Sequence, residues 1–215
     1  MVIDAIISPT LHQTLGQMVK LGIMASGSGT NFEAVAGAID SGRLNATIPV
    51  LIYNNPEAKV KSRADSWGVP AVLVEHGNYQ HREDFDDAIV KVLQSYGVQW
   101  VVMAGWMRVV TQVLLDAYPS RVINIHPSLL PSFRGMRAVE RALKAGVKIT
   151  GCTAHLVSLE VDSGPILIQA AVPVLPEDTP ESLHGRIQVQ EHLILPEAIA
   201  MVSRRGAESQ RGEGE

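Results

Sequence analysis

The sequence predicts an α/β protein with an open, mostly parallel, twisted sheet and helices on both of its faces. Apolar runs that are typical of buried strands alternate with segments of helical periodicity from residue 19 to residue 126. The run "VQWVVMAG" at 98–105 is almost continuously apolar, as expected of a strand that is covered on both faces. Later, two apolar runs joined by a polar loop predict an antiparallel C-terminal strand pair.

The individual elements follow from this alternation. β-branched and apolar runs predict strands at 19–26, 47–55, 70–76, 98–105 and 121–126, and then at 152–158 and 166–174. Apolar residues at helical spacing predict helices at 31–42, 58–68, 82–97 and 111–118. The segment 179–202 is expected to be a closing helix or helix pair, with Thr179 as its cap and Pro180 in its first turn.

Composition narrows the class of protein. The 215 residues are 46% hydrophobic and 19% charged, which is normal for a globular protein with a full core. The formal net charge of −4 gives no overall attraction for nucleic acid. The single cysteine, Cys152, excludes an internal disulfide and fits a reducing compartment, so we expect a cytoplasmic protein. No apolar stretch approaches the length of a membrane span.

The two ends of the chain differ from its middle. Residues 1–18 lack an early basic region and a long apolar core, so they are an extension of uncertain order rather than a signal peptide. Residues 206–215 form a polar tail that is expected to fray. The domain is therefore expected to span 19–205.

A glycine-rich loop, "ASGSGTN" at 25–31, follows the first predicted strand and opens a helix. Backbone N–H groups and the helix dipole favour an anion at such a position. The dinucleotide fingerprint is incomplete, because Phe32 occupies the third glycine position and no acid follows the second strand. The Walker-A lysine is also missing. The loop therefore suits one phosphate monoester better than a nucleotide, although glycines that only make a tight turn would give the same pattern.

A polar pair ends the strand "VINIH". Alternation along a strand places Asn124 and His126 on one side and Ile123 and Ile125 on the other. Open α/β sheets bind ligands at the carboxyl ends of their parallel strands. The pair is therefore expected to point into a cleft, although either residue alone would more often be structural.

Other polar residues have a functional and a plain interpretation. Asp162 lies in "LEVDSGP", where an aspartate before Ser-Gly usually caps a turn. Gln188, Glu191 and His192 would fit a solvated helix face equally well. Cys152 and His155 are too few to make a zinc site, and no second pair has suitable spacing, so no metal is expected.

Five segments together carry a specific resemblance. In this order and at these separations they closely resemble the phosphoribosylglycinamide formyltransferases, a folate-dependent family of purine synthesis, over roughly residues 19–205. The segments are "ASGSGTN", "AGWMRVV", "NIHPSLLPSFRG", "GCTAHLVSLEVDSGPILIQAAVPV" and "QVQEHLILP". The resemblance implies a Rossmann-like formyltransferase fold and a one-carbon group transferase. Its implied donor is 10-formyltetrahydrofolate, and its acceptor is the amine of 5-phosphoribosylglycinamide, on the de novo route to IMP.

The resemblance also implies roles for single residues. Asn124, His126 and Asp162 match the catalytic trio of the family. The Asn124 amide and a protonated His126 would stabilise a tetrahedral oxyanion. Asp162 would orient the imidazole, favour its charged form and hold a water that carries a proton. The same resemblance suggests a cis bond between Leu130 and Pro131.

Ligand contacts are carried over in the same way. The residues implied for the phosphoribosylglycinamide are Gly29, Thr30, Asn31, Gln188 and Glu191. Those implied for the folate are Arg82, Met107, Arg108, Val109, Val110, Asn124, Ser158, Leu159, Glu160, Val161 and Asp162. Trp106 and Arg134 depart from the residues frequent in the family, and both are expected to retune the edge of the pocket.

Relatives with the same chemistry remain as alternatives. Methionyl-tRNA formyltransferase carries an additional C-terminal domain for tRNA, for which this chain shows no equivalent. Formyltetrahydrofolate hydrolase has an N-terminal regulatory domain and a different residue in the place of Pro127. A non-catalytic phosphometabolite-binding module would not need the trio. We expect small-molecule substrates, no nucleic acid or membrane partner, a monomer or homodimer, and transient contact with neighbouring pathway enzymes.

Overall fold

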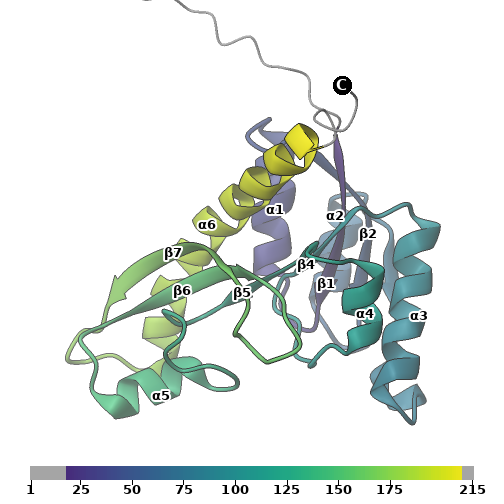
Figure 1. Ribbon diagram of the computed structural model, residues 1–215. Coiled ribbons are helices and arrows are strands. Elements are labelled where there is room, and N and C mark those ends of the chain that lie inside the picture. The colour runs from purple at the N-terminus through teal and green to yellow at the C-terminus, as the bar shows by residue number, and fades with distance from the viewer. Residues whose placement is uncertain (1–17, 210–215) are drawn as a thin grey trace, which may run out of the picture.

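The computed structural model describes residues 18–209 (Figure 1). Most of the predicted N-terminal extension and the end of the predicted tail, 210–215, lie outside the described residues. The last helix reaches Ser209, so the segment predicted as a polar tail begins within that helix. In the described part, no helix combines the length and the apolar character that crossing a membrane requires.

The centre of the molecule is a seven-stranded sheet with the order β3-β2-β1-β4-β5-β6-β7. Strands β1 to β5 pair in parallel, whereas β6 runs antiparallel to both β5 and β7. The strands are β1 (Val19–Ala25), β2 (Ala46–Tyr53), β3 (Ala71–Leu73), β4 (Trp100–Met103), β5 (Val122–His126), β6 (Ile149–Leu156) and β7 (Ile166–Pro173). The predicted fold class and the antiparallel C-terminal pair are therefore confirmed.

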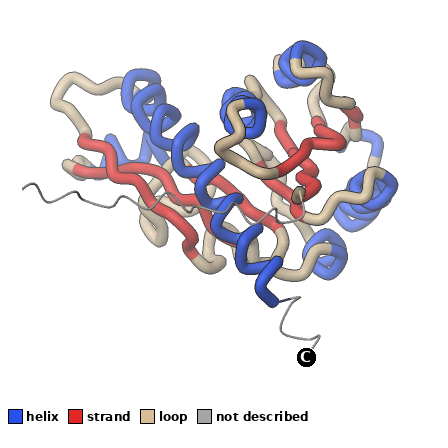
Figure 2. Tube along the Cα trace, turned by 90° about the horizontal axis from the view of Figure 1, so that it is seen from above, coloured by secondary structure: helices blue, strands red, loops and turns tan. Residues whose placement is uncertain are grey.

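Helices surround this sheet. They are α1 (Thr30–Asp40), α2 (Val60–Ser66), α3 (Arg82–Ser95), α4 (Gln112–Ala117), α5 (Ala138–Ala145) and α6 (Pro180–Ser209), with a short 3₁₀ turn at His76–Asn78. The closing segment is one helix, and Pro196 lies inside it. Figure 2 shows this long helix running across the strands. Thr179 accepts the N–H of Ser182 at 3.2 Å, which confirms the predicted cap.

Helix α5 was not predicted from the sequence. It begins after Arg137, which has a left-handed backbone conformation with φ 54°, and it ends at Gly146 with φ 68°. Its apolar side chains Ala138, Val139 and Ala142 are buried, while the opposite side is charged. The segment between β5 and β6 therefore contains a regular helix beside the end of β5 and is not an irregular loop.

Two apolar clusters cover the two faces of the sheet. One contains Ile123, Ile125 and the buried side of α6, and the other contains Val122 and the buried sides of α3 and α4. The two faces have such clusters because parallel strands need cover on both sides. The strand order reverses between β1 and β4, and loops after the carboxyl ends of strands at such a point form the usual binding crevice of open α/β sheets.

Candidate active site

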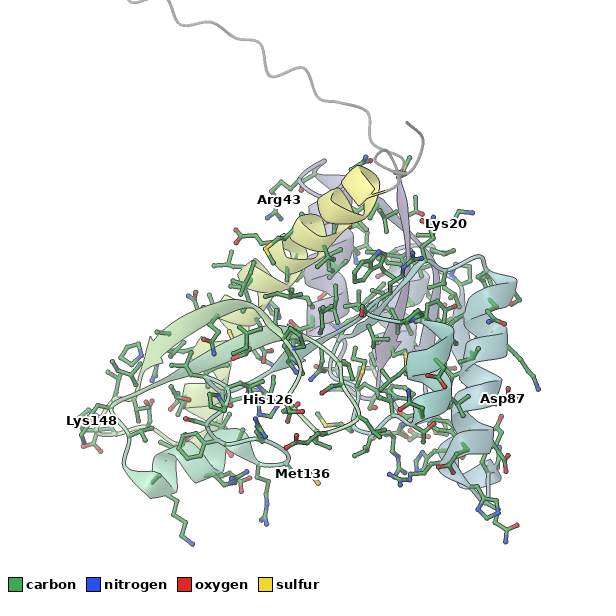
Figure 3. All side chains as sticks on the ribbon, in the orientation of Figure 1. Lys20, Arg43, Asp87, His126, Met136 and Lys148 are labelled. Atoms are coloured by element: carbon green, nitrogen blue, oxygen red, sulfur yellow. The ribbon has the colours of Figure 1, made fainter. Side chains whose placement is uncertain are left out.

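The end of β5 presents two polar side chains on one face. Asn124 and His126 alternate with the buried Ile123 and Ile125, so they share the face of Val122, as the sequence predicted. Helices α3 and α4 cover Val122, but the strand then continues toward its carboxyl end. Figure 3 shows His126 there, in the same part of the molecule as the exposed Met136.

Asp162 reaches this pair from the loop between β6 and β7. Its Oδ2 atom lies 3.2 Å from Nδ1 of His126, and its Oδ1 atom lies 3.4 Å from Nδ2 of Asn124. The backbone N–H of Gly135 also donates to Oδ2, at 2.8 Å. Asp162 has a left-handed backbone conformation, φ 52°, so it belongs to a turn as well as to the polar cluster. The structure therefore brings the three predicted catalytic residues together.

Both ring nitrogens of His126 face oxygen acceptors. Nδ1 faces Asp162, and Nε2 lies 3.0 Å from the carbonyl oxygen of Phe133. A neutral imidazole has one N–H and can donate to only one of them, whereas an imidazolium donates to both. The loop that carries Phe133 also contains the cis peptide bond between Leu130 and Pro131, as predicted.

The charge state of the site follows from burial and partners. Burial lowers the pKa of His126 below its ordinary value of 6.5, and the Asp162 carboxylate opposes this change without cancelling it. The expected rise in the histidine pKa is therefore outweighed, and the ring is mostly neutral at pH 7. Burial raises the pKa of Asp162, but the donors around its carboxylate, among them the Gly135 N–H, together bring that pKa below the usual value, so Asp162 is ionised.

His155 joins the site, and the sequence did not reveal its place there. It lies directly opposite Asn124 on β6, is 1% exposed, and its Nε2 atom is 3.1 Å from Nδ2 of Asn124 and 3.6 Å from Oδ1 of Asp162. Its Nδ1 atom lies 2.9 Å from the carbonyl oxygen of Leu156, so in the neutral ring Nδ1 carries the proton. Nε2 is then an acceptor, and the amide hydrogens of Asn124 point toward His155 and Asp162.

The glycine-rich loop forms a second cluster. Gly29 has φ 78° and precedes the first residue of α1, Thr30, which is partly buried. Nδ2 of the buried Asn31 donates to Oε2 of Glu191 at 2.9 Å, while Oδ1 of Asn31 has no hydrogen-bond partner. Glu191 is 4% exposed, and burial raises the pKa of its carboxyl. Gln188 lies on the same helix and is partly exposed. The loop thus lies against α6, as the predicted substrate contacts require.

The predicted folate segments lie after β4 and β6. Met107, Arg108 and Val109 are exposed and Val110 is buried, and the Met107 N–H donates to Oγ of Ser26 at 2.9 Å, which joins this segment to the glycine-rich loop. In the loop of Asp162, Ser158 is partly buried, and Leu159, Glu160 and Val161 are exposed. Exposed apolar side chains on both segments suit a flat apolar ring. Arg82 is exposed at the start of α3.

Trp106 and Arg134 take different positions. Trp106 is buried and stacks on Phe85 with ring centroids 5.9 Å apart, so its ring belongs to the apolar cluster that contains the buried side of α3. Arg134 is at the surface, and its Nη1 atom lies 2.9 Å from Oε1 of Glu160. This ion pair connects the loop of Phe133 with the loop of Asp162.

Two further features bear on the assignment. Among residues 18–209 there is no group of three or more His, Cys, Asp or Glu side chains that could hold a metal ion. A cavity of about 400 Å³ lies along α6, and Figure 3 shows one of its lining residues, Arg43, near the top of the view, well above His126. Its lining residues are Arg43, Leu193, Pro196, Glu197, Ala200 and Met201.

Comparison with known proteins identifies the family. Residues 19–199 match the family described as formyl transferase. The chain is 39% identical to the phosphoribosylglycinamide formyltransferase of Bacillus subtilis over 182 residues, which is 85% of this chain and 93% of that protein. The crystal structure of glycinamide ribonucleotide transformylase 1 from Symbiobacterium toebii superposes with a TM-score of 0.86 and 45% identity, covering 87% of this chain and 88% of that chain.

The chain therefore belongs to the formyl transferase family, and the resemblance inferred from the five segments is confirmed. It also resembles part of a longer protein. It is 38% identical over 185 residues to the trifunctional purine biosynthetic protein adenosine-3 of Gallus gallus, and the match covers 86% of this chain but 18% of that protein.

Proposed function

We propose that this chain transfers a formyl group from 10-formyltetrahydrofolate to the amine of 5-phosphoribosylglycinamide, a step of de novo purine synthesis. The observation that carries the proposal is the contact of Asp162 with both His126 and Asn124 at the end of β5. The relatives at 39% and 45% identity that bear this activity in their names support it.

The substrates are assigned to the two sides of this contact. The phosphate would bind the N–H groups at Gly29, Thr30 and Asn31, where the start of α1 favours an anion. The unpartnered Oδ1 of Asn31 and the second carboxylate oxygen of Glu191 are acceptors for ribose hydroxyls, and Gln188 lies on the same helix. A ribonucleotide held by these groups would extend its glycinamide amine toward β5.

The folate would lie on the other side. The backbone of Met107–Val110 and the loop Ser158–Asp162 offer the polar groups that fix a pterin, and their exposed apolar side chains cover its faces. Arg82 and Arg108 are exposed cations that suit the carboxylates of the donor. The formyl carbon then meets the amine beside Asn124 and His126.

Each member of the trio has a task in the transfer. The neutral amine attacks the formyl carbon, and the carbonyl oxygen gains negative charge. That charge raises the affinity of the neighbouring His126 ring for a proton, so the ring takes a proton from solvent as the oxyanion develops, donates to it as an imidazolium, and returns the proton to solvent when the oxyanion collapses. One N–H of Asn124 stays on His155, and the other turns from its long 3.4 Å contact with Asp162 to donate to the oxyanion. The ionised Asp162 accepts a proton from the attacking nitrogen through water, and that proton passes to the leaving folate nitrogen.

An absorbance assay that follows release of the deformylated folate tests this proposal. Purified protein is mixed with 10-formyltetrahydrofolate in three arms: with 5-phosphoribosylglycinamide, with formyl-acceptor tRNA, and with no acceptor. We expect release only with the ribonucleotide. Release without an acceptor would indicate a hydrolase, release only with tRNA a tRNA formyltransferase, and binding without any release a phosphometabolite-binding module.

The proposal extends to partners and location. The small molecules above are the proposed substrates, and a monomer or homodimer acts without nucleic acid or a membrane. Relatives occur as a separate chain in Bacillus subtilis and within a trifunctional protein in Gallus gallus. The second arrangement supports transient contact with neighbouring pathway enzymes, and the lone buried Cys152 supports a cytoplasmic location.

A further inference from the structure

Helix α2 holds two carbonyl groups of the glycine-rich loop. The N–H of Val60 donates to the carbonyl oxygen of Gly27 at 3.1 Å. Nε of Arg63, almost one turn later, donates to the carbonyl oxygen of Ser28 at 2.8 Å. The loop and the helix also pack closely, because a Cβ atom at Gly29 would lie 2.4 Å from Cγ2 of Val60. The back of the loop is therefore fastened to α2.

These two contacts determine where the N–H groups of the loop point. In a planar trans peptide, the C=O of one residue and the N–H of the next point in opposite directions. Since the carbonyls of Gly27 and Ser28 point to α2, the N–H groups of Ser28 and Gly29 point away from it. They join the N–H groups in the first turn of α1, which have no partner within the helix.

Arg63 has a second contact on α1. Its guanidinium forms an ion pair with the carboxylate of Glu33, which lies in the first turn of that helix. A carboxylate there would repel a phosphate that binds the same helix end. The guanidinium offsets this charge while its Nε holds the loop. One side chain thus acts on both the geometry and the electrostatics of the anion site.

We infer that Arg63 is a positioning residue for the phosphate of the substrate, acting through the Ser28 carbonyl, and that its guanidinium also offsets the charge of Glu33 at the same helix end. The inference rests on the proposed function for the identity of the phosphate ester. A second observation at the same place points to a ligand: Asn31 is 8% exposed, and its Oδ1 atom is unpartnered. Arg63 itself needs no contact with the phosphate.

The test compares variants on the two helices. Arg63→Met removes both contacts, Arg63→Lys keeps one donor, and Glu33→Gln keeps the contact with Ser28. Lys61→Met is the matched control, since Lys61 lies on α2 but pairs with Asp65 at 2.6 Å, away from the loop. For each protein, KM for the ribonucleotide and kcat are measured, together with the Kd of inorganic phosphate by calorimetry.

We expect Arg63→Met to raise KM and the phosphate Kd about tenfold, the usual scale for loss of one charge-assisted hydrogen bond, with kcat within about threefold. Arg63→Lys should recover part of this loss. Glu33→Gln should leave KM unchanged or lower, and Lys61→Met should change nothing. The inference is overturned if Arg63→Met lowers kcat instead of raising KM, or if Glu33→Gln or Lys61→Met raises KM equally.

The phosphate measurement separates this inference from the proposed function. If the wild-type protein binds phosphate but does not transfer a formyl group, and Arg63→Met still weakens phosphate binding, the inference stands and the proposed function fails. If transfer occurs and the phosphate Kd is the same in wild type, Arg63→Met and Arg63→Lys, the proposed function stands and the inference fails.

Discussion

Asn124 and His155 lie directly opposite each other on β5 and β6, with Nδ2 of Asn124 3.1 Å from Nε2 of His155. The orientation of the amide follows from its two neighbours. Asp162 is an ionised acceptor beside the same amide, so the opposite orientation would place the amide oxygen against a carboxylate. His155 therefore determines which side of Asn124 faces β6 and which side faces the substrate.

Substitution of His155 tests this role. In His155→Leu, the Asn124 amide loses an acceptor and the Leu156 carbonyl loses its donor, so we expect kcat to fall about tenfold. The free energy of unfolding should fall by about 1–3 kcal/mol because buried polar groups lose their partners. His155→Gln, which can still offer an acceptor to Asn124, should lose less of both. Steady-state kinetics and thermal melts measure the effects, and an unchanged kcat in His155→Leu would show that the amide needs no help from β6.

Asp162 belongs both to a turn and to the polar cluster. A substitution that removes only its charge separates these two roles. Asp162→Asn should fold normally, because asparagine tolerates the φ of 52° seen there. Turnover should fall by roughly 10²–10⁴, since the proton acceptor is lost. The double variant with His126→Asn should be little worse than either single one, because the residues act as a unit.

A double-mutant cycle on kcat is the measurement, with calorimetric substrate binding and melting temperatures as controls. If Asp162→Asn keeps more than about a tenth of wild-type turnover, well inside the expected loss, then Asp162 is only a turn residue. The plain interpretation of "LEVDSGP" would then be correct.

The parts of the fold and site that the sequence predicts are those with local causes. Alternation alone places Asn124 and His126 on one face, and the change of pattern after β5 predicts the antiparallel strands β6 and β7. Helix α5 also had a local signal, the apolar Ala138, Val139 and Ala142 followed by Gly146, but it directly follows the proline-containing stretch 127–135, whose pattern is typical of a loop.

The missed contacts depend on register between distant segments. His155 meets Asn124 only because β5 and β6 pair with these two residues opposite each other, and periodicity does not set that register. Arg63 meets Ser28 across 35 positions of the chain, and no local pattern predicts a contact between such distant segments. Burial also decides the charge of His126, and the pattern of residues around it does not show how deeply its side chain is buried.

The titration of His126 is a direct test of the buried site. Its folded-state pKa is lowered, so in the pH window from 6.5 down to that pKa the unfolded chain binds more protons than the folded one. Stability should therefore fall as the pH decreases through this window, and His126→Asn should remove that part of the loss. NMR of the imidazole should give a pKa below 6.5, and Asp162→Asn should lower it further because the attractive carboxylate is gone.

His192 also has a pKa lowered by burial, so His192→Asn is the control for the stability profile. His192→Asn should remove the part of the stability loss at low pH that comes from His192, and it should leave the NMR titration of His126 unchanged. A His126 pKa above 6.5 in the wild-type protein would mean that Asp162 outweighs burial and that the ring is charged before substrate binds.

Gly29 is the position of the glycine-rich loop where a side chain is excluded. Gly29→Ala adds a Cβ atom 2.4 Å from Val60 Cγ2 at a residue with φ 78°, so we expect a loss of at least about 1 kcal/mol of unfolding free energy. Val60→Ala in the same protein should restore part of it. Gly37→Ala on α1, where the added atom meets open space, should keep or raise the melting temperature. Equal melting temperatures for Gly29→Ala and wild type would contradict the close packing of loop and helix.

Glu191 is expected to show opposite effects on stability and on binding. Burial raises the pKa of its carboxyl, and Asn31 and His184 oppose only part of that rise. A carboxyl with a raised pKa favours the folded state when protonated, and this advantage is lost as the pH rises through the folded-state pKa. Above pH 4.5 the unfolded chain holds this glutamate ionised while burial opposes its ionisation in the folded chain, so stability at pH 7 is reduced, and Glu191→Gln, which can still accept from Asn31, should raise the melting temperature.

The same change should weaken the ribonucleotide, because a neutral amide is a poorer acceptor for ribose hydroxyls than a carboxylate. We expect KM to rise about tenfold, while the gain in melting temperature should grow as the pH rises above 4.5 and vanish below it, where glutamate is protonated in both states. Glu197→Gln, an exposed glutamate on the same helix, is the matched control and should change neither quantity. A lower melting temperature for Glu191→Gln at pH 7 would mean that the ionised carboxylate stabilises the fold, and an unchanged KM would remove Glu191 from the ribose site.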